Sequence, residues 1–226
     1  MFRKKAMMQK GNLLISMILI MTMMLSMAAP AEIAHAAESA SQMRLERTQG
    51  TVSVLNAARR SQSVRSKMRL FNGYHVKTEQ KSYAWLSLDS SKAAKVDAKS
   101  DIGLRSRGKK LELFVSSGNL FFNVDKKLGD DETMNIRSSN MTTGVRGTIG
   151  WAAAISVRHT RIGILEGSVE VKVTNPFSGV TKIAVVRAGE VADLYSTPQD
   201  VPGATPGTST ATDKPVVEKE KISLQR

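Results

Sequence analysis

The chain contains no cysteine among its 226 residues. This absence excludes disulfides, thiolate metal sites, cysteine nucleophiles and a lipid anchor on an N-terminal cysteine. Aromatic residues are few, at 5%, and there are only three histidines. The sequence also lacks a G-x-S-x-G nucleophile elbow, an H-E-x-x-H zinc motif and a phosphate-binding P-loop. We therefore predict that the protein is not an enzyme and needs no cofactor.

The scarce metal-ligand residues are poorly spaced for a metal site. His35 lies in a segment that we expect to be removed, and His75 and His159 lack partners at ligand spacing. The acidic run at 130–132 lacks the spacing of an EF-hand loop and is typical of a solvated turn. We predict no metal site.

Positive charge is abundant. Lysine and arginine number 33 against 20 acidic residues, which gives a net charge of +13. Residues 1–36 hold four of the cations and one acid, so the remaining chain keeps 13 − 3 = +10. A basic protein favours anionic partners such as nucleic acid, lipid headgroups or acidic wall polymers.

The first 36 residues resemble a secretory signal peptide. Four basic side chains within the first ten residues precede an apolar run at 13–25, and Ala34-His35-Ala36 fits a cleavage site. The run is shorter than the roughly 20 residues of a membrane span. We predict cleavage after Ala36 and a secreted or extracytoplasmic location at the cell envelope. The alternative is an uncleaved signal anchor, through which the protein would contact the membrane.

A period of two in hydrophobicity begins near Gly50 and recurs to about Leu194. Ala84, Leu86 and Leu88, for example, alternate with Tyr83 and Trp85. Glycine-containing turns separate such runs, and convincing amphipathic helices are lacking. We predict an all-β fold, an antiparallel β-sandwich or β-roll of about ten or more short strands, preceded by the signal-peptide helix. The expected organisation is a signal peptide (1–36), a flexible lead-in (37–49), a β domain (50–195) and a Pro/Thr/Ser/Gly-rich linker with a charged tail (196–226). Within the lead-in, Met43 and Leu45 could alternatively begin a strand.

The stretch at 142–150 has three glycines among β-branched residues. Glycine at such spacing marks turns, bulges or close backbone approaches. Arg146 is the one charge in the stretch. We weigh a structural arginine that holds two strands together against an anion-binding arginine, and favour the structural role because a lone arginine is a weak site signal.

These residues carry a family resemblance. Val145-Arg146-Gly147-Thr148 resembles the central motif of the FecR domain family, and flanking motifs follow the family order at 50–52, 73–78, 164–171 and 188–191. Departures occur at Tyr74, where the family has aspartate, and at 89–91. The resemblance covers about Gly50 to Leu194 and assigns a structural motif to Thr143, Gly144, Val145, Arg146, Gly147, Thr148, Gly167 and Gly189.

The resemblance implies an extracytoplasmic β domain. Its best known members are membrane-spanning regulators whose cytoplasmic segment binds a sigma factor. Only about a dozen residues precede the apolar run here, too few for a folded partner-binding domain. We therefore expect the extracytoplasmic domain alone, without the sigma-regulator segment.

Cations recur in three consecutive segments of the predicted domain. If the strands place them on one face, they form a positive surface for an anionic envelope polymer. Tyr74, Tyr83 and Trp85 could stack on sugar rings beside it, although packing against a second sheet face is the favoured alternative. Solvated loops are the alternative for the cations. The candidate anion-binding residues are Arg59, Arg60, Arg65, Lys67, Arg69, Lys92, Lys95, Lys99, Arg105, Arg107, Lys109 and Lys110.

These observations predict a non-enzymatic binding or interaction module at the cell envelope. Its partner would be an anionic polymer, a glycan or a protein. One alternative is an envelope signalling or scaffold component recognised through a sheet edge. A nucleic-acid-binding protein is a remote alternative, because basic and aromatic residues are not interleaved and a signal peptide is predicted.

Overall fold

The computed structural model describes residues 43–125, 131–203 and 214–222, which form seventeen strands and one short 3-10 turn, η1 (Pro198–Asp200). The predicted signal-peptide helix and its cleavage site lie outside these residues. Within the described ranges, no helix is long and apolar enough to cross a membrane. The prediction of an all-β fold with more than ten strands is confirmed.

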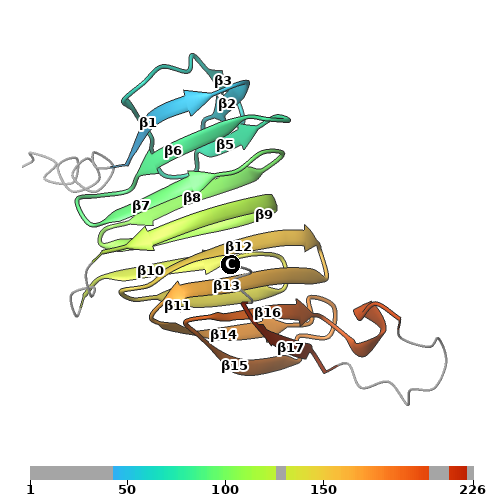
Figure 1. Ribbon diagram of the computed structural model, residues 1–226. Helices are drawn as coiled ribbons and strands as arrows, with labels where there is room; N and C mark the ends of the chain where they lie inside the picture. The colour runs from blue at the N-terminus through green and yellow to red at the C-terminus, as the bar shows by residue number, and fades with distance from the viewer. Residues whose placement is uncertain (1–42, 126–130, 204–213, 223–226) are drawn as a thin grey trace, which may run out of the picture. The chain divides into compact units, whose positions relative to one another are not determined.

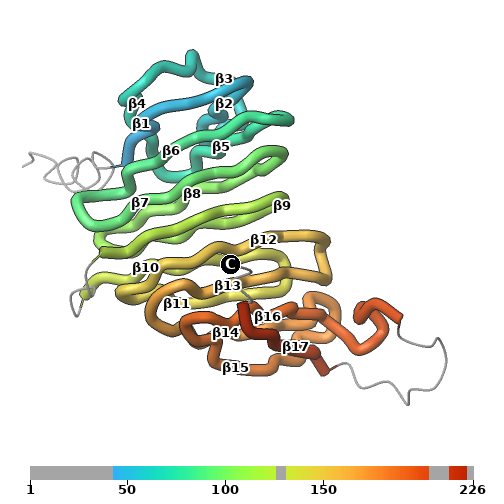
Figure 2. The backbone as a smooth tube through the Cα atoms, viewed as in Figure 1, coloured from blue at the N-terminus to red at the C-terminus, as the bar shows by residue number. Residues whose placement is uncertain are grey.

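The strands form two sheets that share one long strand, β9 (Figure 1). The first sheet runs in the order β4 (Met68–Arg69), β1 (Arg44–Gln49), β6 (Tyr83–Ser87), β7 (Lys92–Val96), β9 (Lys110–Val124), β12 (Ile149–Ser156), β13 (His159–Glu166), β16 (Glu190–Tyr195) and β17 (Val216–Lys221). The second runs in the order β3 (Ser61–Gln62), β2 (Val52–Leu55), β5 (His75–Thr78), β8 (Asp101–Arg107), β9, β10 (Thr133–Arg137), β11 (Met141–Val145), β14 (Ser168–Thr174) and β15 (Thr181–Arg187). The tube in Figure 2 shows the chain passing back and forth between them.

Alternating side chains divide each strand between a core and an outer face. On β6, Ala84 and Leu86 are buried while Tyr83 and Trp85 are only partly buried. Leu104 on β8 and Leu113 on β9 enter the same core from the second sheet. Because successive side chains of a strand point to opposite sides, each sheet buries one face and exposes the other.

Strand β9 passes from the second sheet to the first near Gly118. Gly118 has a φ of +76°, and a Cβ there would lie 2.2 Å from Ser100 Oγ. Asn119 N donates to the same hydroxyl at 2.8 Å. Glycine is therefore needed both for the backbone conformation and for the close approach. The pairing of β9 with β10 is parallel, which makes the architecture mixed, not wholly antiparallel.

Two segments differ from the expected organisation. Arg44–Gln49, expected to be part of a flexible lead-in, forms β1 and pairs with β6. Val216–Lys221, expected to be part of a charged tail, forms β17 and pairs with β16 along its whole length. Leu45 anchors β1 in the core between β4 and β6, whereas β17 is mostly exposed and is ordered chiefly by pairing at the sheet edge.

Candidate functional site

The central glycine motif lies where the chain turns from β11 in the second sheet to β12 in the first. Gly147 and Gly167 have φ values of +60° and +81°, and a Cβ on Gly167 would lie 2.7 Å from the Gly147 carbonyl oxygen. Ala188 N donates to Gly167 O at 2.9 Å, next to Gly189 with a φ of +80°. Three corners therefore contact one another in series along one edge of the two sheets.

The flanking motif residues hold this edge through backbone contacts. Thr143 Oγ1 donates to Glu170 O at 2.8 Å, and the fully buried Thr148 accepts through its carbonyl from Val124 N at 3.1 Å. Gly144 and Val145 form the end of β11. The side chain of Arg146 is exposed at the corner and does not enter the core.

The predicted anion-binding cations do not share one face, so the expected continuous positive surface does not form. Arg59, Arg60, Arg65, Lys67 and Arg69 are exposed around the short strands β3 and β4, and Lys99 is exposed in the turn before β8. Lys95 lies on the outer face of the first sheet and Arg105 on that of the second. The period of two explains the division, because it decides the face within a strand but not which sheet the strand joins.

Several of these cations are neutralised within the molecule. Lys92 is buried and lies 2.5 Å from Asp89 Oδ2 and 3.4 Å from Glu132 Oε2. Lys109 pairs with Asp131 at 2.6 Å. Such cations have limited capacity to attract a further anion.

Arg105, Arg107 and Lys110 are brought together around a shallow depression of about 590 Å³ on the second sheet. The depression also contains Glu112, which Arg105 Nη1 approaches at 3.1 Å and Arg137 Nη1 at 3.2 Å. Its lining has no aromatic ring and Glu112 already engages two arginines, which makes this the weaker of two candidate sites.

The stronger candidate is a row of side chains on the outer face of the first sheet. Cross-strand register places Arg47 beside Trp85, Trp85 beside Lys95, Lys95 beside Phe121 and Phe121 beside Trp151. We call these five residues the aromatic row. They come from five neighbouring strands, and directly opposed side chains on one sheet face are in contact range.

Both cations of the aromatic row lie over rings. The Arg47 guanidinium carbon is 3.7 Å from the centroid of the Trp85 ring. Lys95 Nζ is 4.5 Å from the centroid of Tyr83, 5.8 Å from that of Trp85 and 5.5 Å from that of Phe121. Within the described residues neither cation has a carboxylate partner, so ring faces hold them while their charges stay available.

Gly163 determines how Trp151 closes the row. A Cβ on Gly163 would lie 2.5 Å from Trp151 Nε1 and 2.6 Å from Trp151 Cε2. The indole therefore lies across the neighbouring strand β13 at a position where only glycine leaves room for it.

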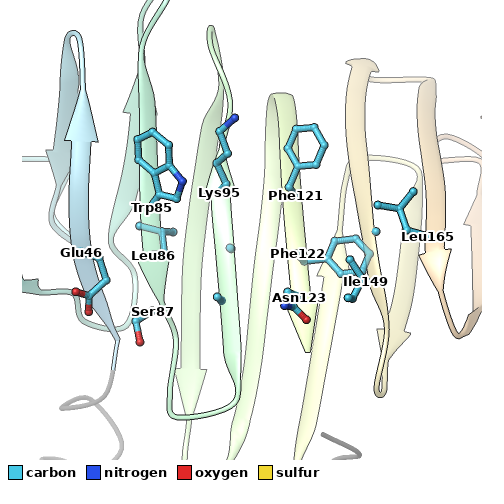
Figure 3. Close-up of a pocket in the computed structure, with 13 residues that line it drawn as sticks. Glu46, Trp85, Leu86, Ser87, Lys95, Phe121, Phe122, Asn123, Ile149 and Leu165 are labelled. Carbon is cyan, nitrogen blue, oxygen red and sulfur yellow. The ribbon is translucent and has the colours of Figure 1, made fainter. Parts of the chain in front are cut away.

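A groove of about 360 Å³ runs beside the aromatic row (Figure 3). Trp85, Lys95 and Phe121 stand side by side on three neighbouring strands, with Ile149 and Leu165 beyond them. The floor of the groove lies at Ala93, whose side chain is small. Ala93 is paired across the strands with Ser87 on one side and Asn123 on the other.

One buried acceptor in the groove lacks a donor. Asn123 Oδ1 is shielded from solvent and has no hydrogen-bond partner in the described part of the chain. Unsatisfied buried acceptors are uncommon because each loses the hydrogen bond it made to water. A ligand hydroxyl or amide could supply the donor. Glu46, at the end of the groove, is its one lining carboxylate.

His75 and His159 lie outside the groove, each beside an aspartate. His75 Nδ1 lies 3.0 Å from Asp101 Oδ1, and His159 Nε2 lies 2.7 Å from Asp193 Oδ1. Among the described residues, no group of three or more ligand-type side chains gathers as a metal site. The groove offers rings, the cation of Lys95 and the acceptor of Asn123, and Arg47 lies beside it in the aromatic row. These groups suit binding.

Sequence reasoning found part of this site. It singled out Tyr83, Trp85 and Lys95, but it missed Arg47, Phe121, Trp151 and Asn123. Phe121 and Asn123 have the opposite parity to the buried Leu120 and Phe122, so the period of two already placed them on an outer face. The register between strands distant in sequence was not predictable. Tyr74 packs against the core, away from this site.

Residues 74–170 match the family model described as FecR protein, which confirms the predicted resemblance to the FecR domain family. Two crystal structures of a candidate anti-sigma factor from Parabacteroides distasonis ATCC 8503, at 2.50 Å and 1.65 Å, each align with a TM-score of 0.48 and 12% identity. Each alignment covers 65% of this chain and 59% of the other, less than two thirds of those proteins. A comparison with curated proteins gives no match.

Proposed function

We propose that the protein is an extracytoplasmic binding module that holds an anionic glycan of the cell envelope along the aromatic row. The observation that carries the proposal is the position of Arg47 and Lys95, which lie over aromatic rings without a carboxylate partner in the described residues. A sugar ring has an apolar face of C–H groups that can stack on an indole or phenyl ring. Its acidic substituents would then meet the two cations.

A glycan fits the groove better than a peptide does. The aromatic row crosses strands whose backbone groups already pair on both sides, as β7 does with β6 and β9. A peptide laid there would gain no main-chain ladder and would have to desolvate its own amides. Sugar hydroxyls can remain in water at the rim, and one can donate to Asn123 Oδ1, which no donor among the described residues reaches.

The match to the FecR family model supports a role at the envelope, and it fits signalling in which ligand occupancy is reported to another component. The predicted signal peptide supports the same compartment. The groove supplies binding groups and lacks a paired nucleophile and base, so we propose recognition and not turnover.

The test is co-sedimentation of the full chain with purified anionic cell-wall polysaccharide across a salt series. We expect binding that weakens as salt rises. Trp85→Ala should weaken it about 10-fold or more, because truncating a central aromatic contact typically costs about 2 kcal/mol. Lys95→Gln should weaken binding several-fold and reduce its salt dependence.

Lys172→Gln is the matched control for Lys95→Gln. Lys172 is an exposed lysine on the outer face of the second sheet, and no carboxylate in the described residues pairs with it. The control should bind as the native chain does. If Lys109→Glu with Lys110→Glu removes binding while Lys95→Gln and Trp85→Ala do not, the depression on the second sheet is the site and the proposal is wrong.

A further inference from the structure

Strand β17 forms the edge of the first sheet but makes few contacts with the core. Its partner β16 is well anchored, with Ala192 and Leu194 fully buried. Four of the six residues of β17 are exposed, and Val217 is its only residue packed against the core. Residues 196–215 separate β17 from β16 along the chain, so β17 can leave the edge without drawing β16 with it.

Like charges face each other across the β16–β17 pair. Glu218 lies directly opposite Asp193 in the register. Like charges in directly opposed positions destabilise a strand pair. Glu220 adds a third carboxylate on the same face, and Arg161 is shared between Glu220 and Asp193. His159 approaches the other oxygen of Asp193. Three acids therefore gather around one arginine and one histidine in a chain that is strongly basic.

The inward face of β17 is also unsuitable for a core. Lys219 lies opposite the buried Ala192, at a position where an apolar side chain would extend the core. Its Nζ instead donates to the Val185 carbonyl of β15 at 2.8 Å and lies 3.5 Å from Glu190. An apolar residue could replace Lys219 and bury more surface.

The environment of this edge also changes the pKa of the nearby Tyr195 side chain. Burial, with Asp193 and Glu218 nearby, raises the pKa of Tyr195 above its ordinary value. The Tyr195 ring stacks on His159 with ring centroids 4.3 Å apart. The outer side of the edge is thus a small acidic patch that a cation would relieve.

We propose that the β16 edge is a binding site for an extended segment of a partner protein, and that β17 occupies the edge until this segment replaces it. The segment has a lysine or arginine between two β-branched apolar residues. The basic residue lies opposite Asp193, and the apolar residues lie opposite Leu194 and Ala192. Strand addition supplies affinity through the main chain, while these three positions supply specificity. This site is separate from the groove, and its test does not depend on glycan binding.

The test uses the full chain and fluorescent peptides of residues 215–222, one in the native sequence and one with Glu218→Lys. The lysine peptide should bind about 2- to 5-fold more tightly, which corresponds to the usual range for one cross-strand charge pair. Hydrogen exchange should show β17 amides losing protection on binding while β16 amides keep theirs. Equal affinities, or protection gained at β15 in place of β16, would overturn the proposal.

A charge reversal in the chain gives an independent readout. Asp193→Lys should invert the preference, so that the native peptide with Glu218 binds more tightly than the lysine peptide. Since Asp193 also contacts His159 and Arg161, Asp193→Asn is the milder variant and should abolish the preference. Introducing Glu218→Lys into the full chain should slow exchange of the β17 amides about 2- to 5-fold. Failure of β17 to exchange separately from the core in the native chain would also refute displacement.

Discussion

The outer faces of the two sheets hold their cations in different ways. On the second sheet, Lys77 lies 2.8 Å from Asp101, and Glu112 is shared by Arg105 and Arg137. On the first sheet, Arg47 and Lys95 lie over the rings of Trp85 and Tyr83. A carboxylate cancels a charge, whereas a ring face positions it and leaves it to act on a partner.

This contrast shows that the number of cations on a face does not predict its partner. The outer face of the second sheet carries more cations from the predicted set, but its depression has no aromatic ring in its lining, and Glu112 there is shared by Arg105 and Arg137. On the first sheet, Arg47 and Lys95 are ordered beside aromatic rings, whereas Arg161 pairs with Asp193 and Glu220. Three experiments can break or sharpen the comparison.

The largest expected effect is a difference in stability between two substitutions on β9, one on the core face of the first sheet and one on its outer face. Phe122→Ala should lower the free energy of unfolding by about 3–5 kcal/mol, because the ring is buried in the core. The next residue along the strand, Phe121, belongs to the aromatic row. Phe121→Ala should lower the free energy of unfolding by about 1 kcal/mol or less, since Phe121 is 38% exposed. Urea unfolding followed by tryptophan fluorescence measures both. Similar losses would mean that the aromatic row is packed as core and is not a free surface.

The second prediction concerns pH on the second sheet. Burial raises the pKa of Asp101, but hydrogen bonds from Lys77 and His75 outweigh it and hold that pKa below its ordinary value. Asp101→Asn should therefore cost about 1–2 kcal/mol at pH 7, as expected for charged hydrogen bonds. Because the folded pKa is the lower one, this stabilisation is present above the ordinary pKa of about 4 and is lost as pH falls through the folded value.

The measurement is the difference in unfolding free energy between the native chain and Asp101→Asn from pH 7 downward. The matched control on the first sheet is Lys95→Gln, whose difference should stay flat because Lys95 contacts aromatic rings and no carboxylate in the described residues. A constant difference for Asp101→Asn would show that its ion pairs contribute nothing that depends on charge.

The smallest expected effect is the change with salt in the coupling energy of two contacts, one on the outer face of each sheet. Double-mutant cycles should give about 0.5–1 kcal/mol for Arg47 with Trp85 and about 0.2–1 kcal/mol for Arg105 with Glu112. At 1 M salt the second coupling should fall more than the first, because an exposed ion pair is screened and the Arg47 contact also buries ring surface. Equal losses would remove the distinction between the two faces.

Much of the fold could be predicted from local sequence. The alternation in residues such as Ala84 and Leu86 gave the strand class, and the glycines at 147, 167 and 189 gave the turns, because both signals are local. Strand β17 could not be predicted, since Glu218–Lys221 has the composition of a solvated tail and is ordered by pairing with β16. The parallel contact of β9 with β10 likewise depends on long-range packing.

The site was only partly predictable for a related reason. Lys92 has the same parity as the buried Ala94 and Val96, so its burial could have been read from the alternation. Its pairing with Glu132, forty residues away, could not. The aromatic row depends on register among five strands, and register follows from turn geometry and core packing, which no single segment encodes.

Strand β9 has a further consequence for how the domain comes apart. It contributes Leu113 to the second sheet and Phe122 to the first, and it pairs with β7, β8, β10 and β12. Neither sheet can therefore open through its centre without breaking a strand that the other also needs. The domain should lose structure from its two ends inward, with the amides of β9 exchanging last and reporting the full unfolding free energy. Cooperativity here is thus a property of connectivity as much as of the core.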